Sequence, residues 1–309
     1  MSLALLRERG VSLADMVSLG PSIVLPREQP FEFNLPCWRP QIEIDDRIPA
    51  FTHRLLRDFN HQWRHILRSP YNSTTLRTLA RAAIRISTLD FEVRANTRGY
   101  GSRISHVWIT HLPPWEPFQT DIVRMGSVHV ILSQTIQNGL LMAQRHLSEQ
   151  TVGSAVNWKS IIHNEGRPDY IILSVRDIML CQINGPNSLR HTAPEPLFNG
   201  NYGIEPPSKL ALDYLVWAIA SARITIPTPI QSLPVEIQDI ILTYGSLGTV
   251  VAARLGCLLN IGSPFLWQDG SLTVALENNH VTRPSGSSVE SLIWFDEHKS
   301  GLVYLARWE

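Results

Sequence analysis

Cysteine is scarce in this sequence, and its arrangement excludes two kinds of site. The chain has three cysteines, which lie far apart: Cys37, Cys181 and Cys257. An odd number of widely spaced cysteines predicts neither a disulfide framework nor a CxxC metal site. Such cysteines are typical of a reducing compartment, so we expect a cytoplasmic protein, with a nuclear location as the alternative.

Long apolar runs are also absent. No stretch approaches the roughly 18 apolar residues that a membrane-spanning helix needs, so we expect no membrane partner. The N-terminus, MSLALLRERG, contains an apolar run that is too short for a signal peptide and is interrupted by charges. The sequence therefore predicts a soluble protein, and its 44% of hydrophobic residues can build a substantial core.

Net charge is lacking as well. The chain has 27 basic and 27 acidic side chains, so nothing draws it as a whole to nucleic acid or anionic membranes. Arginines recur on two expected helices and could form one basic face: Arg54, Arg57, Arg64, Arg68, Arg77, Arg81 and Arg85. No motif of a nucleic-acid reader accompanies them, so we expect solvated helix faces and no nucleic-acid partner.

Several motifs that carry chemistry are missing. There is no glycine-rich phosphate loop, no GxSxG elbow and no dinucleotide fingerprint, which excludes kinases, P-loop nucleotidases and Rossmann dehydrogenases. No cofactor is therefore expected. His61 and His65 lie one helical turn apart, but the intervening QWR lacks the glutamate of a metalloprotease and no third ligand is evident. We expect no metal site.

Hydrophobic periodicity predicts both helices and strands. In residues 50–68, apolar side chains recur at intervals of three and four, which is typical of an amphipathic helix. Further helices are expected at 73–87, 135–150 and 210–222, and strands at 89–94, 103–112, 127–133, 170–175, 178–183 and 272–276, with a hairpin over 292–307. Clean β-α-β repeats are not visible, so this order predicts an α+β fold of mixed helices and antiparallel strands.

A proline-containing stretch, TIPTPIQ at 225–231, is the best candidate for a linker. We expect a main α+β domain over residues 1–225. A smaller part, residues 226–309, is expected to carry a helical pair and the hairpin and to pack on the first domain.

The segment 232–267 reads SLPVEIQDIILTYGSLGTVVAARLGCLLNIGSPFLW. A proline fixes the first turn of a helix, and a short helical hairpin offers an apolar face that can fill a partner's groove. This segment resembles an F-box, the three-helix module by which substrate receptors dock on the Skp-type adaptor of cullin ubiquitin ligases. The resemblance implies a Skp-type adaptor as partner, and it implies these partner-binding residues: Leu233, Pro234, Ile237, Ile241, Leu242 and Trp267.

The segment departs from the F-box pattern in composition and in place. The second helix lacks the basic residues and the tryptophan that usually follow its cysteine, and Gly245, Gly248 and Gly256 would loosen the pair. F-boxes also usually lie earlier in a chain. The alternative is therefore an ordinary pair of core helices. More widely, NEGRPDYIILSVRD, PEPLFNG, SLPVEIQDIIL and SVESLIWF resemble uncharacterised filamentous-fungal proteins, which suggests a lineage and implies no chemistry.

The densest group of polar, titratable residues lies just before an expected strand and comprises His163, Asn164, Glu165, Arg167 and Asp169. At a turn, His163 and Glu165 could exchange a proton, and Arg167 could hold a carboxylate or enolate by two-point contact. The alternative is a solvated turn in which Arg167 pairs with Asp169.

Two hypotheses of function follow from these features. The first is a protein-interaction adaptor, which requires Ile237, Ile241 and Leu242 to be accessible to solvent. The second is a cofactor-independent fungal enzyme, of the cyclase or isomerase type, that acts on a small apolar substrate of secondary metabolism. It requires a concave pocket beside residues 163–169 or beside tryptophans such as Trp108 and Trp115.

Overall fold

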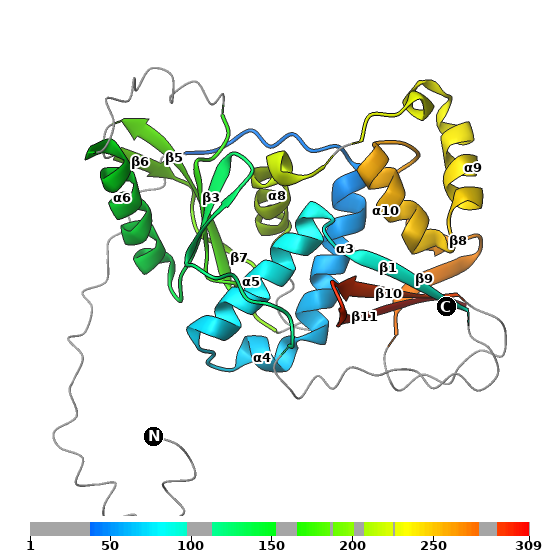
Figure 1. The fold of residues 1–309 in the computed structure, drawn as a ribbon, viewed down its shortest axis with the longest axis horizontal. Coiled ribbons are helices and arrows are strands. Elements are labelled where there is room, and N and C mark those ends of the chain that lie inside the picture. Colours follow the sequence, from blue (N-terminus) through cyan, green and yellow to red (C-terminus); the bar gives the residue numbers. More distant parts are fainter. Residues whose placement is uncertain are drawn as a thin grey trace, which may run out of the picture. The chain divides into compact units, whose positions relative to one another are not determined.

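Two β-sheets of different kinds organise the chain, as the computed structural model shows (Figure 1). The structure describes residues 38–97, 113–152, 166–185, 188–200, 207–224, 226–277 and 289–308, all of which belong to one compact unit, Leu35–Glu309. The helices are α3 (Arg47–Gln62), α4 (Arg64–Arg68), α5 (Ser73–Thr88), α6 (Ile136–Val152), α8 (Lys209–Ala218), α9 (Val235–Gly245) and α10 (Thr249–Leu259). The predicted α+β fold is confirmed. Within the described ranges, no helix combines the length and the apolar character needed to cross a membrane.

The first sheet is mixed and lies between helices. Its strands follow the order β2-β3-β4-β5-β6, with β7 beside β5: β2 (Ile122–Met125), β3 (Val128–Leu132), β4 (Tyr170–Leu173), β5 (Asp177–Gly185), β6 (Ser188–His191) and β7 (Glu195–Pro196). Strands β3 and β4 are parallel and are joined through α6, which makes one β-α-β crossover that the sequence did not reveal. In Figure 1, α6 covers one face of this sheet, and α5 and α8 lie on the other.

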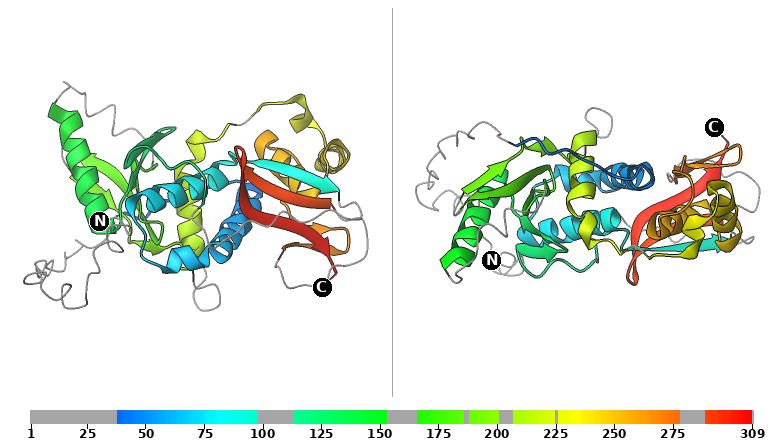
Figure 2. Two further views of the ribbon diagram at one scale, coloured as in Figure 1. Left: turned by 60° about the horizontal axis from the view of Figure 1, so that its bottom comes forward. Right: turned by 90° about the horizontal axis from the view of Figure 1, so that it is seen from above.

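The second sheet is antiparallel and forms a half-barrel (Figure 2). Its order is β1-β10-β11-β9-β8, with β1 (Glu92–Thr97), β8 (Gln268–Asp269), β9 (Leu272–Leu276), β10 (Val289–Phe295) and β11 (His298–Arg307). The predicted C-terminal hairpin is the pair β10–β11. Strand β1 pairs with β10 from Glu92↔Trp294 to Thr97↔Val289, so segments about 200 residues apart share one sheet.

Helix α3 is the wall on which the antiparallel sheet packs, and the contact is aromatic. The indole N–H of Trp63 donates to the carbonyl of Ser300 at 3.0 Å, and that of Trp115 donates to the carbonyl of Lys299 at 3.1 Å. The rings of Trp63 and Trp115 meet edge to face at 4.8 Å, close to the favoured aromatic geometry. The helix predicted over 50–68 is therefore two helices, because the buried Trp63 interrupts the helical backbone with φ −98° and ψ 17°.

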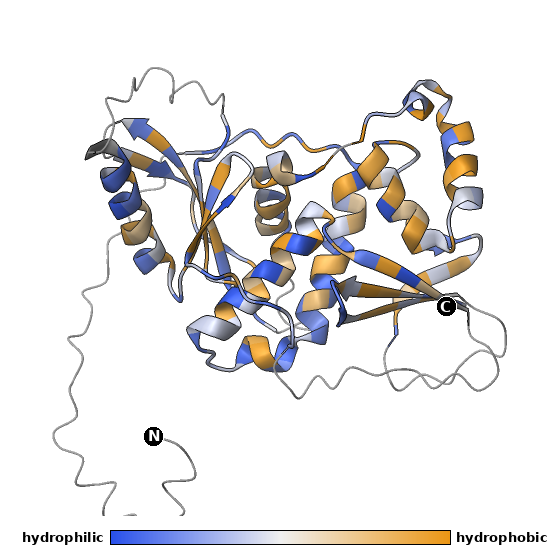
Figure 3. Cartoon of the chain, in the orientation of Figure 1, coloured by the Kyte–Doolittle hydropathy of each residue, from blue (hydrophilic) through white to orange (hydrophobic). Residues whose placement is uncertain are grey.

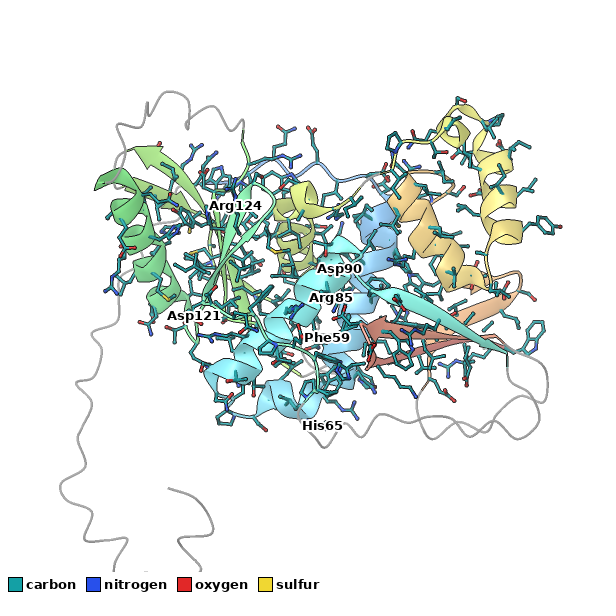
Figure 4. All side chains as sticks on the ribbon, in the orientation of Figure 1. Phe59, His65, Arg85, Asp90, Asp121 and Arg124 are labelled. Carbon is teal, nitrogen blue, oxygen red and sulfur yellow. The ribbon has the colours of Figure 1, made fainter. Side chains whose placement is uncertain are left out.

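The arginines of α5 do not form a bare basic face. Arg77 pairs with Asp121 at 2.8 Å, and Arg81 pairs with Glu116 at 2.9 Å. Arg85 binds both carboxylate oxygens of Asp296 at 2.6 and 2.9 Å, and Figure 4 shows Arg85 beside Asp90. These pairs attach the loop before β2 and the β10–β11 turn to α5, so the arginines serve internal contacts.

Candidate functional site

The helical pair α9–α10 presents a polar side of α9 to the rest of the molecule. The side chain of Gln238 donates to the carbonyl of Leu233 at 2.8 Å and accepts from the amide of Gly262 at 2.6 Å. The carboxylate of Asp239 accepts from the amide of Ser263 at 2.8 Å and from its hydroxyl at 2.7 Å. These bonds fasten the inner side of α9 to the turn that follows α10.

The opposite side of α9 is apolar and faces solvent. Gln238 is the sole buried residue of this helix, whereas Ile237, Ile240 and Tyr244 are 42%, 51% and 87% exposed. Figure 3 shows the predominantly hydrophobic colouring of α9. We define the α9 surface as the exposed apolar residues on this side of the helix, Ile237, Ile240 and Tyr244, together with Leu233 and Leu247, which flank the helix. This distribution is the reverse of that in an ordinary surface helix, which buries its apolar side chains and exposes its polar ones.

The predicted partner-binding residues divide between surface and interior. Leu233, Pro234 and Ile237 are exposed. Ile241 and Leu242 are half-buried, and neither belongs to the buried core. Ile240, Tyr244 and Leu247 were missed, although intervals of three and four, continued from Ile237, could have identified them.

Trp267, also predicted to bind a partner, lies in the core. Its ring stacks on Phe51 at 5.7 Å, and its indole N–H donates to the carbonyl of Ala50 at 2.8 Å. In this conformation it anchors the end of the helical pair to α3. Trp267 is therefore not part of the α9 surface.

The glycines of the pair permit close packing. A Cβ on Gly256 would lie only 3.2 Å from Leu242 Cδ1, so α10 approaches α9 closely at this point. Gly248 has a φ of 99°, a backbone conformation that favours glycine, and it directly precedes α10. Gly256 therefore permits the close contact of the two helices, and Gly248 permits the turn that leads into α10.

A groove of about 270 Å³ lies between the two helices and the loop after α10. Its apolar lining includes Leu242, Ala253 and Phe265. Cys257 also lines it, but burial raises the pKa of this thiol to about 12, and the thiol donates to the carbonyl of Arg47. The thiol is therefore protonated near neutral pH and is a poor nucleophile.

The predicted catalytic cluster is only partly described. His163, Asn164 and Glu165 lie outside the described residues. Asp169 accepts from the amide of Ile183 at 2.8 Å, and burial raises the pKa of its carboxyl group. Arg167 is exposed and lines a cavity of about 570 Å³. Among the ion pairs of the described residues, none joins Arg167 to Asp169.

Metal ligation finds no support in the part of the chain that the structure describes. No group of three or more histidine, cysteine or acidic side chains there could hold a metal ion. Trp115 belongs to the aromatic core, and Trp108 lies outside the described ranges. Comparisons with family models, curated proteins and solved structures find no match to this chain.

Proposed function

We propose that this chain is a non-enzymatic adaptor or receptor that docks on a partner protein through the α9 surface. One observation carries the proposal: in α9 the polar residue Gln238 is buried, whereas the apolar residues Ile237, Ile240 and Tyr244 are exposed. Exposed patches of apolar side chains with a polar rim mark interaction sites, because the free energy falls when a partner removes this apolar surface from water.

A Skp-type adaptor is the partner that we propose, on the strength of the F-box resemblance. Exposed Leu233 and Pro234 lead into a helix that can lie in a hydrophobic groove by its apolar face. Burying one leucine or isoleucine side chain completely is worth about 1.5–3 kcal/mol, and Leu233, Ile237 and Ile240 are already about half-buried, so a partner must cover several of them together to offset the cost of association. We place the protein in a reducing compartment such as the cytoplasm, in keeping with its three widely spaced cysteines.

A cofactor-independent fungal enzyme of the cyclase or isomerase type is the second candidate. It is favoured by one observation, the cavity of about 570 Å³ beside Arg167. A cavity of this size suits a small substrate, and Arg167 could stabilise an enolate or carboxylate there. In this scheme His163 and Glu165 would supply the base and the acid, with Asp169 beside them.

Binding to a purified Skp-type adaptor tests the first proposal. We expect the substitutions Ile237→Asp and Ile240→Asp together to weaken binding about 100-fold or more, because each places a charge in an apolar contact. Both side chains are at least 42% exposed, so the variant is expected to fold normally. Calorimetric titration measures the affinity, and urea denaturation checks the fold.

Leu141→Asp is the matched control. Leu141 is 49% exposed on α6, outside the α9 surface, so the same chemical change there should leave adaptor binding unaltered. Failure of the unmodified protein to bind the adaptor would contradict the proposal. Equal binding by the unmodified protein and the doubly substituted variant would contradict it too.

A further inference from the structure

The cavity beside Arg167 is formed by four segments that are distant in the sequence. Residues 38–43 cross from the mixed sheet towards α3 (Figure 1), and the amide of Trp38 donates to the carbonyl of His191 in β6 at 3.2 Å. Arg190 of β6, Arg167 before β4 and Trp217 of α8 line the cavity from the other three segments. The volume, about 570 Å³, falls within the range of roughly 300–1,000 Å³ of small-molecule sites.

Positive charge dominates the lining of this cavity. Arg39, Arg167 and Arg190 line it, against the single carboxylate of Glu43. Glu43 accepts a hydrogen bond from Gln41 at 3.4 Å, and no ion pair within the described residues joins it to an arginine. Three guanidinium groups that share a cavity create a potential that attracts an anion.

Two of these arginines are available for a ligand, and the third is held in place. Arg39 and Arg167 are exposed, and no hydrogen bond links either guanidinium to another residue that the structure describes. Arg190 donates through Nε to Gln182 Oε1 at 2.9 Å, and Gln182 Nε2 donates in turn to the carbonyl of Arg167 at 2.9 Å. Gln182 therefore orients Arg190 and fixes the backbone at Arg167, so this part of the lining is ordered without a ligand.

Two tryptophans form part of the cavity wall, but little of either ring is exposed. Trp38 and Trp217 both line it, and each is 6% exposed. The guanidinium carbon of Arg190 lies 5.9 Å from the Trp38 ring, which adds to the order of this wall. Guanidinium groups bind carboxylate or phosphate by paired hydrogen bonds, so the arginines supply the recognition at this cavity.

We propose that this cavity binds a small organic anion that carries a carboxylate or phosphate group. The arginines recognise the oxyanion, and the volume of the cavity accommodates the organic part of the ligand. The inference stands apart from the docking function, because the cavity shares no residue with the α9 surface. Binding of such a molecule is also compatible with an adaptor, which could sense it at this cavity.

Titration calorimetry on the full chain tests the proposal with four probes. The probes are 1-naphthoate, 1-naphthyl phosphate, the neutral 1-naphthamide and inorganic phosphate. We expect at least one of the two aryl anions to bind saturably at one site. The amide and inorganic phosphate should bind at least about tenfold more weakly, since the amide lacks the charged oxyanion and inorganic phosphate lacks the organic part that fills the cavity.

Substitutions locate the binding. Arg39→Gln and Arg167→Gln together should weaken aryl-anion binding by about 10–100-fold, because two charged hydrogen-bond donors are lost. Both side chains are exposed, so folding should be preserved. Arg145→Gln, at an exposed position of α6 that does not line the cavity, should leave the affinity unchanged.

The preferred aryl anion identifies the oxyanion, and a preference for either one supports the proposal. Three results would overturn it. These are the absence of saturable binding by both aryl anions, equal affinity for the amide, and unchanged affinity in the doubly substituted variant.

Discussion

Asp58 shows how a single buried side chain links distant parts of this chain. It is 3% exposed on α3, where it accepts from the hydroxyl of Tyr304 at 3.0 Å and pairs with Arg54. Burial raises the pKa of Asp58, and burial beside this carboxylate raises the pKa of Tyr304 well above its ordinary range. A buried polar group needs such partners, because an unpaired one costs the desolvation energy.

His53 is a second buried ionisable residue of α3. Its side chain is 8% exposed, and Nε2 lies 3.3 Å from Asp213 Oδ1 without forming a hydrogen bond. Burial lowers the pKa of His53 to about 4, and the positive charges of Arg57 and Lys209 add to the effect. The loss of hydration therefore outweighs the nearby carboxylate, and the imidazole is neutral near pH 7.

We predict that His53 makes the folded state less stable in acid. The unfolded pKa of 6.5 exceeds the folded pKa of about 4, so between these values the unfolded chain binds a proton that the folded chain does not. Stability should fall as the pH falls through this window, by about 3 kcal/mol in total from this residue. Urea denaturation at several pH values from 7 to 4 measures the slope.

His53→Gln removes this titration and should flatten the dependence in the same window. The comparison with the unmodified protein cancels the titration of other groups. Identical slopes for the two proteins would show that His53 is not the source.

At the scale of elements, the amphipathic helices were largely predictable and the β-pairing was not. The expected helix 73–87 is α5, Ser73–Thr88, because its apolar stripe is a local feature, and the structure shows Asn72 as its N-cap. The parallel pairing of β3 with β4 depends on α6 crossing the sheet, which no local pattern specifies. Strand β7, which pairs with β5, is likewise absent from the strands that the sequence pattern predicts.

Two helical glycines should respond in opposite directions to alanine. A Cβ on Gly139 of α6 would overlap Ile172 Cγ2 of β4, so Gly139→Ala should destabilise the protein by about 1–3 kcal/mol. A Cβ on Gly245 of α9 would meet nothing within 4 Å, so Gly245→Ala should stabilise it by up to about 1 kcal/mol.

Urea denaturation of both glycine variants measures these changes. Because both positions are helical, the difference between them isolates the contact of α6 with the sheet. Equal effects of the two substitutions would mean that α6 does not lie as close to β4 as described.

For the whole molecule, the antiparallel sheet bears on whether the C-terminal part, residues 226–309, can fold independently. Its edge strand β1 precedes residue 225, and its hairpin β10–β11 follows residue 226. Trp63 and Trp115 donate across this division to the carbonyls of Ser300 and Lys299. Residues 226–309 therefore share both a sheet and a core with the residues before them.

We predict that fragment 226–309, expressed alone, shows no cooperative unfolding transition, because it lacks β1 and the wall provided by α3. Co-expression with fragment 1–225 should restore cooperative unfolding. Circular dichroism during urea titration measures both. A cooperative transition of the isolated fragment would instead establish it as an independent domain.

The sequence alone determined those features that depend on neighbours in the chain. These are the amphipathic helices, the hairpin at the C-terminus and the start of α9 after Pro234, each of which follows from spacing or from one residue's backbone preference. For the candidate docking site, it identified Leu233, Pro234 and Ile237, all of which are exposed.

Only the tertiary structure decided which way these elements face. The apolar side of α9 points outward because Gln238 and Asp239 bind the turn after α10, and Trp267 turns inward onto Phe51, more than 200 positions earlier in the sequence. Arg167 meets Trp38 at one cavity in the same way. Such contacts depend on how distant segments bury their surfaces together, and no local pattern carries that information.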